Sequence, residues 1–285
     1  HSGFEEKSKL FKTLQDEWKK IGPVAKTQSD KIWNEFREHF DPFFKSKKEF
    51  YNKQKEASKI TIEAKSKLIE KAKKITSYPV LIVDHGDNTG SGGSADDMSV
   101  LAEMLRQGLS GIIVAPIRDP EAVDQLIKCG EGNEMTLTVG GKYSVPSINQ
   151  IGQGLNCTGI VKKITDGCFK ITSPVQTGLK VCLGRTVVFD IGPATIIISE
   201  EGWEPYGPEL FMHGGLFPKE NRFMLIKSRV HFRAGFESIT NNIIMAAGPG
   251  VTSSDYSQFN FSQIPKPMFP FDKKMKLKNI IFYNK

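Results

Sequence analysis

The residues with the clearest chemical potential form one loop, DHGDNTGSGGSADD, at positions 84–97. The loop follows the apolar run YPVLIV and precedes MSVLAEMLRQGL, which has the pattern of a helix. Carboxylates alternate here with glycines, which let the backbone turn tightly. Such a loop at the end of a strand could bind a phosphate, bind a metal ion, or serve only to reverse the chain.

The phosphate interpretation rests on a short pattern. Residues 90–95 fit the GxGxxG/A dinucleotide pattern, and Asp119 lies 24 residues beyond Ala95. Four aspartates surround the glycines, however, and the loop contains no Lys or Arg, so a pyrophosphate would meet like charges at short range. Ser94 and Asp97 also have capping-box spacing, which predicts a helix start closed by its own side chains. The loop therefore favours a cationic or hydrogen-bonding ligand.

A metal ion is the next ligand to consider. Asp84, His85 and Asp87 could form a carboxylate-rich patch, but Gly86 stands where a calcium loop needs a ligand. The five histidines are scattered and form no HExxH motif, whereas a catalytic zinc requires three His or carboxylate ligands. We therefore expect no metal site in this chain, and a His85 side chain that is solvated or hydrogen-bonded.

A second group of charged residues lies in the segment KSRVHFR. If this segment is a strand, alternation places Lys227, Arg229, His231 and Arg233 on one face. Arginine would hold a carboxylate in a two-pronged fork, lysine as a point charge, and histidine could carry a proton near neutral pH. The alternative is an exposed edge strand that uses charge against aggregation. Lys142, after two glycines, is a weaker candidate.

The elements that position these residues are of two kinds. YPVLIV and GIIVAPIRDP have the pattern of buried strands, and residues 95–108 and 120–130 that of helices, which predicts a parallel βαβ opening. Short β-like runs follow from Gly132 onward with Gly or Pro between them, which predicts antiparallel hairpins. We expect a further strand over 222–232 and a helix over 235–247. The predicted class of this part is α+β.

The amino-terminal part is predicted to be a separate all-α segment. Two aromatic-rich helical faces, one ending near Ile21 and one from Ile32 to Phe40, are separated by the helix breaker Gly22-Pro23. Pro42 lies at the end of the second pattern, which resumes from Phe43 onward. Residues 1–76 hold 19 Lys/Arg against 12 Asp/Glu, whereas 77–285 hold 20 of each. The basic excess could contact nucleic acid through phosphates, or it could be a solvated helix face.

Composition limits the class of protein. With 39% hydrophobic and 25% charged residues, no apolar run long enough to span a membrane and no signal-like start, the chain is predicted to be cytoplasmic with no membrane partner. Its four cysteines form no CxxC pair and are expected to be reduced. The predicted divisions are a helical segment over 1–76, an α+β domain over 78–272 and a basic tail over 273–285.

Two stretches resemble known families. The stretch LQDEWKKIGPVAKTQSDKIWNEFREHFDPFF resembles a bacterial helical repeat of unknown function, over residues 4–60. VDHGDNTGSGGSADD, GIIVAPIRDPEAV, TVGGK, IKSRVHFRAGF and AAGPGVTSSD resemble, in that order, the carboxyl-terminal domain of the MlrC family over about 78–272. The joining of the two suggests a domain fusion. The family loop commonly has proline where this chain has Thr89, so we expect a looser loop.

The MlrC resemblance implies a zinc metallopeptidase whose zinc ligands lie in an amino-terminal domain that these 285 residues lack. It therefore implies a substrate-side domain that is inactive alone, meets a zinc-domain partner and binds a peptide or amide. The implied substrate-binding candidates are Asp84, Asp87, Asn88, Gly90, Gly92, Gly93, Lys227, His231 and Arg233. The alternatives are a non-enzymatic protein whose basic helices bind RNA or a protein partner, and a nucleotide-dependent enzyme that uses the glycine loop.

Overall fold

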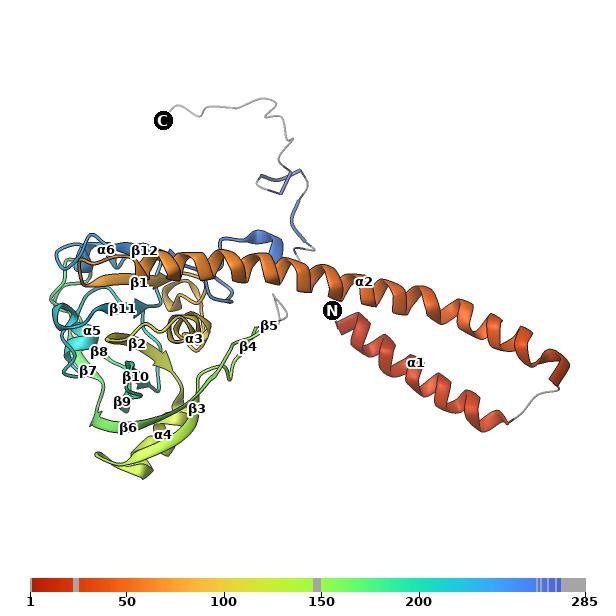
Figure 1. Ribbon diagram of the computed structural model, residues 1–285, viewed down its shortest axis with the longest axis horizontal. Helices are drawn as coiled ribbons and strands as arrows, with labels where there is room; N and C mark the ends of the chain where they lie inside the picture. The colour runs from red at the N-terminus through yellow and green to blue at the C-terminus, as the bar shows by residue number, and fades with distance from the viewer. Residues whose placement is uncertain are drawn as a thin grey trace. The chain divides into compact units, whose positions relative to one another are not determined.

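The computed structural model describes residues 2–22, 26–145, 150–259, 261, 263–265, 267–269 and 271–272. It divides into two compact units, His1–Lys67 and Leu68–Lys285 (Figure 1). The predicted basic tail, 273–285, lies outside the described residues. In the described part of the chain, no helix is both long and apolar enough to cross a lipid bilayer.

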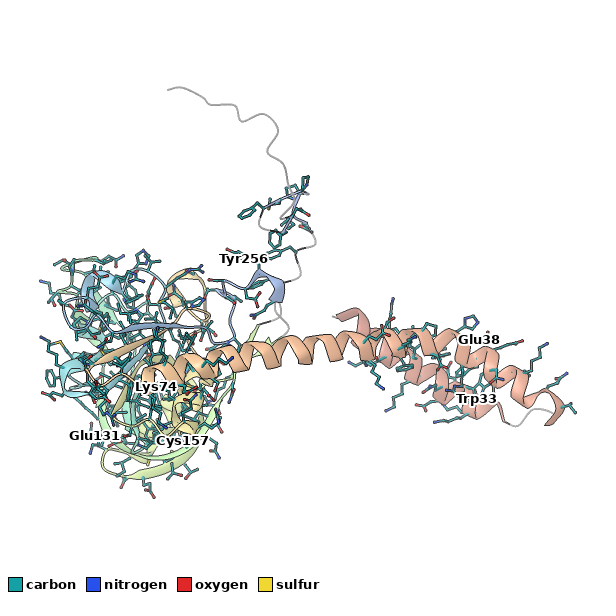
Figure 2. All side chains as sticks on the ribbon, turned by 45° about the horizontal axis from the view of Figure 1, so that its top comes forward. Trp33, Glu38, Lys74, Glu131, Cys157 and Tyr256 are labelled. Atoms are coloured by element: carbon teal, nitrogen blue, oxygen red, sulfur yellow. A yellow bond between two sulfur atoms is a disulfide. The ribbon has the colours of Figure 1, made fainter. Side chains whose placement is uncertain are left out.

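The first unit is a hairpin of two helices, α1 (Ser2–Ile21) and α2 (Lys26–Lys73), which lie side by side in Figure 1. The aromatic faces predicted from the sequence meet between the helices, because the ring centroids of Trp18 and Phe36 lie 4.2 Å apart. Trp33, on α2 in Figure 2, remains 47% exposed. Short amphipathic helices gain most of their stability from such packing.

Helix α2 continues through Pro42, so the apolar patterns before and after this proline belong to one helix. The division between the two units falls inside this helix, between residues 67 and 68. The last turns of α2 belong to the second unit, where Ile69 and Ala72 are buried in its core.

Within the described residues, the second unit contains short helices and the strands β1 to β12. The strands of its main sheet are β1 (Val80–Asp84), β2 (Ile112–Arg118), β3 (Glu134–Val139), β6 (Leu155–Thr165), β9 (Thr186–Asp190), β10 (Ala194–Ser199), β11 (Phe223–Ile226) and β12 (Ile243–Ala246). Two ladders outside it pair β4 (Ser144–Val145) with β5 (Gln150–Ile151) and β7 (Cys168–Lys170) with β8 (Lys180–Cys182). The helices are α3 (Ser99–Arg106), α4 (Pro120–Cys129), α5 (Glu209–Met212) and α6 (Arg233–Phe236), with 3-10 turns η1 (Thr89–Ser91), η2 (Pro218–Glu220) and η3 (Tyr256–Gln258).

The main sheet has the order β12-β1-β11-β2-β10-β9-β6-β3. Its first five strands are parallel, and β9, β6 and β3 extend it with antiparallel pairing. The predicted α+β class is therefore confirmed. The βαβ opening is also present, although β11 lies between β1 and β2, so these two strands do not pair directly.

Two cores lie on opposite faces of the sheet, because successive side chains of a strand point to opposite sides. Val80 and Ile82 of β1 pack with α3 and α4, whereas Leu81 and Val83 pack with α5 and α6. Burial on both faces explains why the parallel strands are continuous apolar runs in the sequence. The sheet is therefore a rigid base for the loops at its edges.

The predicted helix over 235–247 is wrong. This segment contains only part of the short α6, followed by β12, which pairs in parallel with β1. The apolar run at 243–246 is too short for its periodicity to distinguish strand from helix.

The prediction of four reduced cysteines is wrong for two of them. Cys168 and Cys182 form a disulfide across the β7–β8 ladder, where the two residues stand directly opposite each other. Cys129 and Cys157 are free. The pair was missed because its partners are 14 residues apart in sequence and are brought together only by the hairpin.

Candidate substrate-binding face

Loops from all five parallel strands gather at one edge of the sheet. Residues 84–97 begin at the end of β1, Asp119 follows β2, residues 200–206 follow β10, Lys227 follows β11, and Gly248 lies just beyond β12. Parallel strands bring their carboxyl ends to the same edge, which is where open α/β sheets bind ligands. We call this edge the carboxyl-end face.

Asp87 organises the glycine-rich loop. Its carboxylate, 1% exposed, accepts hydrogen bonds from the N–H of Ala95 at 2.9 Å, the N–H of Asp97 at 3.0 Å and the hydroxyl of Ser94 at 3.0 Å. Gly93 is needed beside it, because a Cβ there would lie 2.5 Å from the carbonyl carbon of Asp87. The loop is therefore folded around one of its own aspartates.

The predicted capping box of Ser94 and Asp97 is wrong. Helix α3 begins only at Ser99 and has no side-chain cap at its start. Ser94 instead donates to Asp87, while Asp97 accepts from the N–H of Ser99 at 3.1 Å and from the N–H of Gln153 at 2.9 Å. Each of the two side chains therefore has other hydrogen-bond partners, of which only Gln153 is distant in the sequence.

Lys227 is the cation that the acidic loop holds. Its Nζ lies 3.0 Å from Asp84 Oδ2 and 3.1 Å from Asp87 Oδ2, and it donates to the carbonyl oxygen of Asp97 at 2.6 Å. Burial would by itself lower the pKa of Lys227, but the carboxylates of Asp84, Asp87 and Asp97 outweigh it and hold the pKa above its ordinary value. The ammonium group is therefore charged at neutral pH.

Asp84 and Asp97 complete this buried charge cluster. Asp84 also accepts from the N–H of Gly248 at 2.8 Å, which fastens the loop after β12 to the end of β1. Burial raises the pKa of Asp97 from 3.8 to about 6; Lys227 opposes this shift and Asp84 adds to it. Asp97 therefore exchanges its proton closer to neutral pH than an ordinary aspartate does.

Two further buried aspartates tie the neighbouring loops together. Asp96 accepts from the N–H groups of Lys142 and Tyr143, each at 2.8 Å. Asp119 caps α4 by accepting from the N–H of Ala122 at 3.0 Å, and it pairs with Lys142 Nζ at 2.8 Å. Lys142, the weaker candidate from the sequence, therefore takes part in this loop network.

The predicted strand through residues 227–233 is wrong. β11 ends at Ile226, the chain turns, and α6 begins at Arg233. Lys227 is buried, the side chain of His231 is 60% exposed, and Arg233 approaches Glu237 at 3.8 Å. These charged side chains therefore do not share one face, and only Lys227 among them reaches the acidic loop.

Glu204 and His231 form a second cluster on the carboxyl-end face. Glu204, only 4% exposed, accepts from the hydroxyl of Ser228 at 2.8 Å and lies 3.1 Å from Nδ1 of His231. The ring of Tyr206 packs edge-on against the imidazole, with centroids 5.6 Å apart. Gly90 lies against Glu204, because a Cβ at position 90 would collide with Oε2. The glycine loop and the turn after β11 therefore meet at Glu204.

Sequence reasoning missed Glu204. It lies in the charged run SEEGWEPYG, just after the buried strand β10. A polar residue at the carboxyl end of a buried parallel strand is the same signal that identified the loop at 84–97. That signal could have identified Glu204 as well.

The remaining loop candidates shape the turn itself. Asn88 is buried, and its side-chain oxygen accepts from the N–H of Gly90 at 3.0 Å, which caps η1. Gly92 ends η1 with φ at 94°, a left-handed conformation that favours glycine. These residues fix the backbone on which the rest of the face depends.

The zinc implied by the MlrC resemblance does not fit these residues. Among the residues that the structure describes, no three His, Cys, Asp or Glu side chains are grouped to hold a metal ion. The oxygens of Asp84, Asp87 and Asp97 are already engaged by backbone N–H groups, hydroxyls or Lys227.

The sequence that builds this face belongs to a known family. Residues 82–263 match the MlrC C-terminus family, and the chain belongs to it. Residues 31–85 match the Domain of Unknown Function DUF349, which confirms the resemblance of the amino-terminal part to a repeat of unknown function. The matched range lies further along the chain than the predicted 4–60.

One protein related in sequence and one solved structure are similar to this chain. Microcystinase C from Sphingomonas sp. is 35% identical over 204 residues, which cover 72% of this chain and 38% of that protein. The crystal structure of a metallopeptidase candidate from Mesorhizobium sp. BNC1 shares the fold, with a TM-score of 0.63 and 22% identity over 76% of this chain and 41% of that one. The chain thus spans about two fifths of the length of each relative.

Proposed function

We propose that this chain supplies the substrate-side domain of an MlrC-type metallopeptidase and that its carboxyl-end face binds a peptide or amide. The observation that carries the proposal is the convergence of five strand ends on a loop network held by the buried Lys227, in a chain of the MlrC C-terminus family. The 35% identity to microcystinase C supports an amide-cleaving context.

The contribution of this domain is to bind and orient the substrate. The carboxylates of Asp84, Asp87 and Asp96 are each satisfied within the protein, so the loops are formed before a ligand arrives. A preformed surface loses little conformational entropy on binding. We propose that the zinc chemistry of the family is supplied by a domain outside these 285 residues, and that this chain alone does not cleave peptides.

Titration of the isotope-labelled chain with N-acetyl-dialanine amide, followed by nuclear magnetic resonance, tests the proposal. We expect saturable shifts of backbone signals in residues 84–97, 200–206 and 227–233, with no release of amine from the peptide. Sodium acetate at the same concentration is the control for small solutes. Absence of loop shifts, or cleavage by the chain alone, would contradict the proposal.

The charge distribution favours a second role for the helical segment. Residues 1–76 carry a net charge of +7, from 19 basic and 12 acidic residues, whereas 77–285 carry none. We propose that this segment contacts nucleic-acid phosphates, independently of the carboxyl-end face. Such binding weakens as the salt concentration rises, because it releases condensed counterions.

A further inference from the structure

The pairing of Glu204 with His231 fixes which imidazole nitrogen is available to a ligand. A carboxylate accepts hydrogen bonds and donates none, so Nδ1 of His231 is the donor across the 3.1 Å contact. In the neutral imidazole, Nε2 then carries a lone pair and no proton. The side chain of His231 is 60% exposed and that of Glu204 is 3% exposed, so the orienting group is buried and the oriented one is accessible.

Gly90 provides the space for this arrangement. A side chain at position 90 would collide with the carboxylate of Glu204, although the backbone of Gly90 is not in the left-handed region. An added Cβ at this position would therefore displace the Glu204 carboxylate from its present place beside His231. The neighbouring Gly92 is the opposite case, because its φ is 94° and a Cβ at that position would have open space for 4 Å around it.

We propose that Nε2 of His231 accepts a hydrogen bond from an N–H group of a bound peptide or amide, with Glu204 as the positioning residue. The inference rests on the proposed function, that the carboxyl-end face binds such ligands. An acceptor backed by a carboxylate suits an N–H donor, whereas a carboxylate or phosphate ligand brings no donor and meets the charge of Glu204. The ring of Tyr206 packs edge-on against the imidazole and offers a contact for the apolar part of such a ligand.

The first test reads the imidazole directly, in the full chain. Long-range nitrogen–proton spectra above the ordinary pKa of histidine distinguish the two tautomers. We expect the Nδ1–H form for His231 in the wild type, and its loss in both Glu204→Ala and Gly90→Ala. Lys219→Ala, at an exposed position of η2 outside the carboxyl-end face, is the control and keeps the wild-type tautomer. An Nε2–H tautomer in the wild type would overturn the proposal, and the Gly90 variant keeps the test decisive if Glu204→Ala does not fold.

The second test measures the ligand contact, with N-acetyl-dialanine amide as the probe. We expect the Nε2 signal of His231 to move on titration and His231→Ala to weaken binding about 2- to 10-fold, as loss of one hydrogen bond does. His39→Ala, at an exposed position of α2, is the control and leaves binding unchanged.

The outcomes separate this inference from the function on which it rests. If the loop signals respond but Nε2 does not, and His231→Ala binds as the wild type does, the His231 contact is wrong and the substrate-binding face stands. If no loop signal responds, the proposed function fails and the contact fails with it.

Discussion

The ammonium group of Lys227 is buried between the carboxylates of Asp84 and Asp87, at 3.0 and 3.1 Å. Lys227→Met keeps an unbranched side chain of similar length but leaves both carboxylates without their counter-ion. Removing one partner of a buried charge group costs about 3–5 kcal/mol, so we expect a loss of that size in the free energy of unfolding. Urea denaturation followed by fluorescence measures it.

An exposed ion pair provides the control for this prediction. Lys74 approaches Glu70 at 2.9 Å, and their side chains are 73% and 56% exposed. Surface pairs contribute about 0–1 kcal/mol, so Lys74→Met should change the unfolding free energy far less. Losses of similar size in the two variants would show that the buried Lys227 cluster contributes no more to the free energy of unfolding than an exposed ion pair does.

Asp97 gives the buried cluster a dependence on pH. Its pKa rises from 3.8 to about 6 in the folded protein, with burial as the main cause. The native state therefore binds the proton more tightly than the unfolded state does, and the associated stability is present below 3.8 and lost as the pH rises through about 6. At 1.36 kcal/mol per pKa unit, the loss is on the order of 3 kcal/mol.

Comparison with Asp97→Asn isolates this effect, because asparagine does not titrate. Unfolding free energies of both proteins, measured by urea denaturation on either side of this pH range, give a difference between wild type and variant. We expect the free energy of unfolding of the wild type to fall relative to that of Asp97→Asn as the pH rises. A difference that stays level or moves in favour of the wild type would mean that Asp97 ionises without penalty.

Among the elements, the strands buried on both faces were predictable and the segments fixed by distant partners were not. β1 and β2 are long apolar runs between turn residues, which local sequence identifies. β12 is a short run, and it is a strand because it pairs with β1, about 160 residues earlier. β11 ends where Lys227 meets the carboxylates of the β1 loop, a contact that no local spacing records.

In the candidate site, too, features of local sequence were predictable and contacts between distant residues were not. The acidic loop was found from its composition and its place after a strand. Lys227 was also named as a candidate, but its burial within the loop was not predicted, because it is 130 or more residues away in sequence from the groups that it contacts. Glu204 carries no motif, and its pairing with His231 depends on a turn that alternation misread as a strand.

Helix α2 contains a proline whose cost can be measured. A proline in a helix interior lacks an N–H and clashes with the preceding turn, at a cost of about 3 kcal/mol. We expect Pro42→Ala to raise the thermal stability of the helical signal in far-ultraviolet circular dichroism. Pro120→Ala, at the first turn of α4 where proline is tolerated, should have little effect. An unchanged or lowered midpoint for Pro42→Ala would show that packing around Pro42 compensates for its cost.

The molecule as a whole joins two units with different chemistry. The MlrC match covers residues 82–263, whose strand ends build the carboxyl-end face, and the DUF349 match covers 31–85. All of the net charge of +7 belongs to residues 1–76. Binding to a polyanion could depend on the net charge of the whole chain or on the basic residues of 1–76 in particular. Variants that change the charge equally in the two parts distinguish these explanations.

Single-stranded poly-uridine RNA tests whether the helical segment binds phosphates. Replacing the exposed Lys12, Lys20 and Lys45 by glutamate changes the charge of that segment, and replacing the exposed Lys162, Lys180 and Lys219 makes the same change elsewhere. Fluorescence anisotropy across a salt series should show binding that the first set abolishes or weakens, with the slope of log affinity against log salt reduced by about 0.7 per lost contact. The second set should bind nearly as the wild type does, because its lysines lie outside the basic segment. Equal weakening in both sets would show that binding depends only on net charge. If the wild type does not bind the RNA, the proposal that the helical segment contacts nucleic acid is wrong.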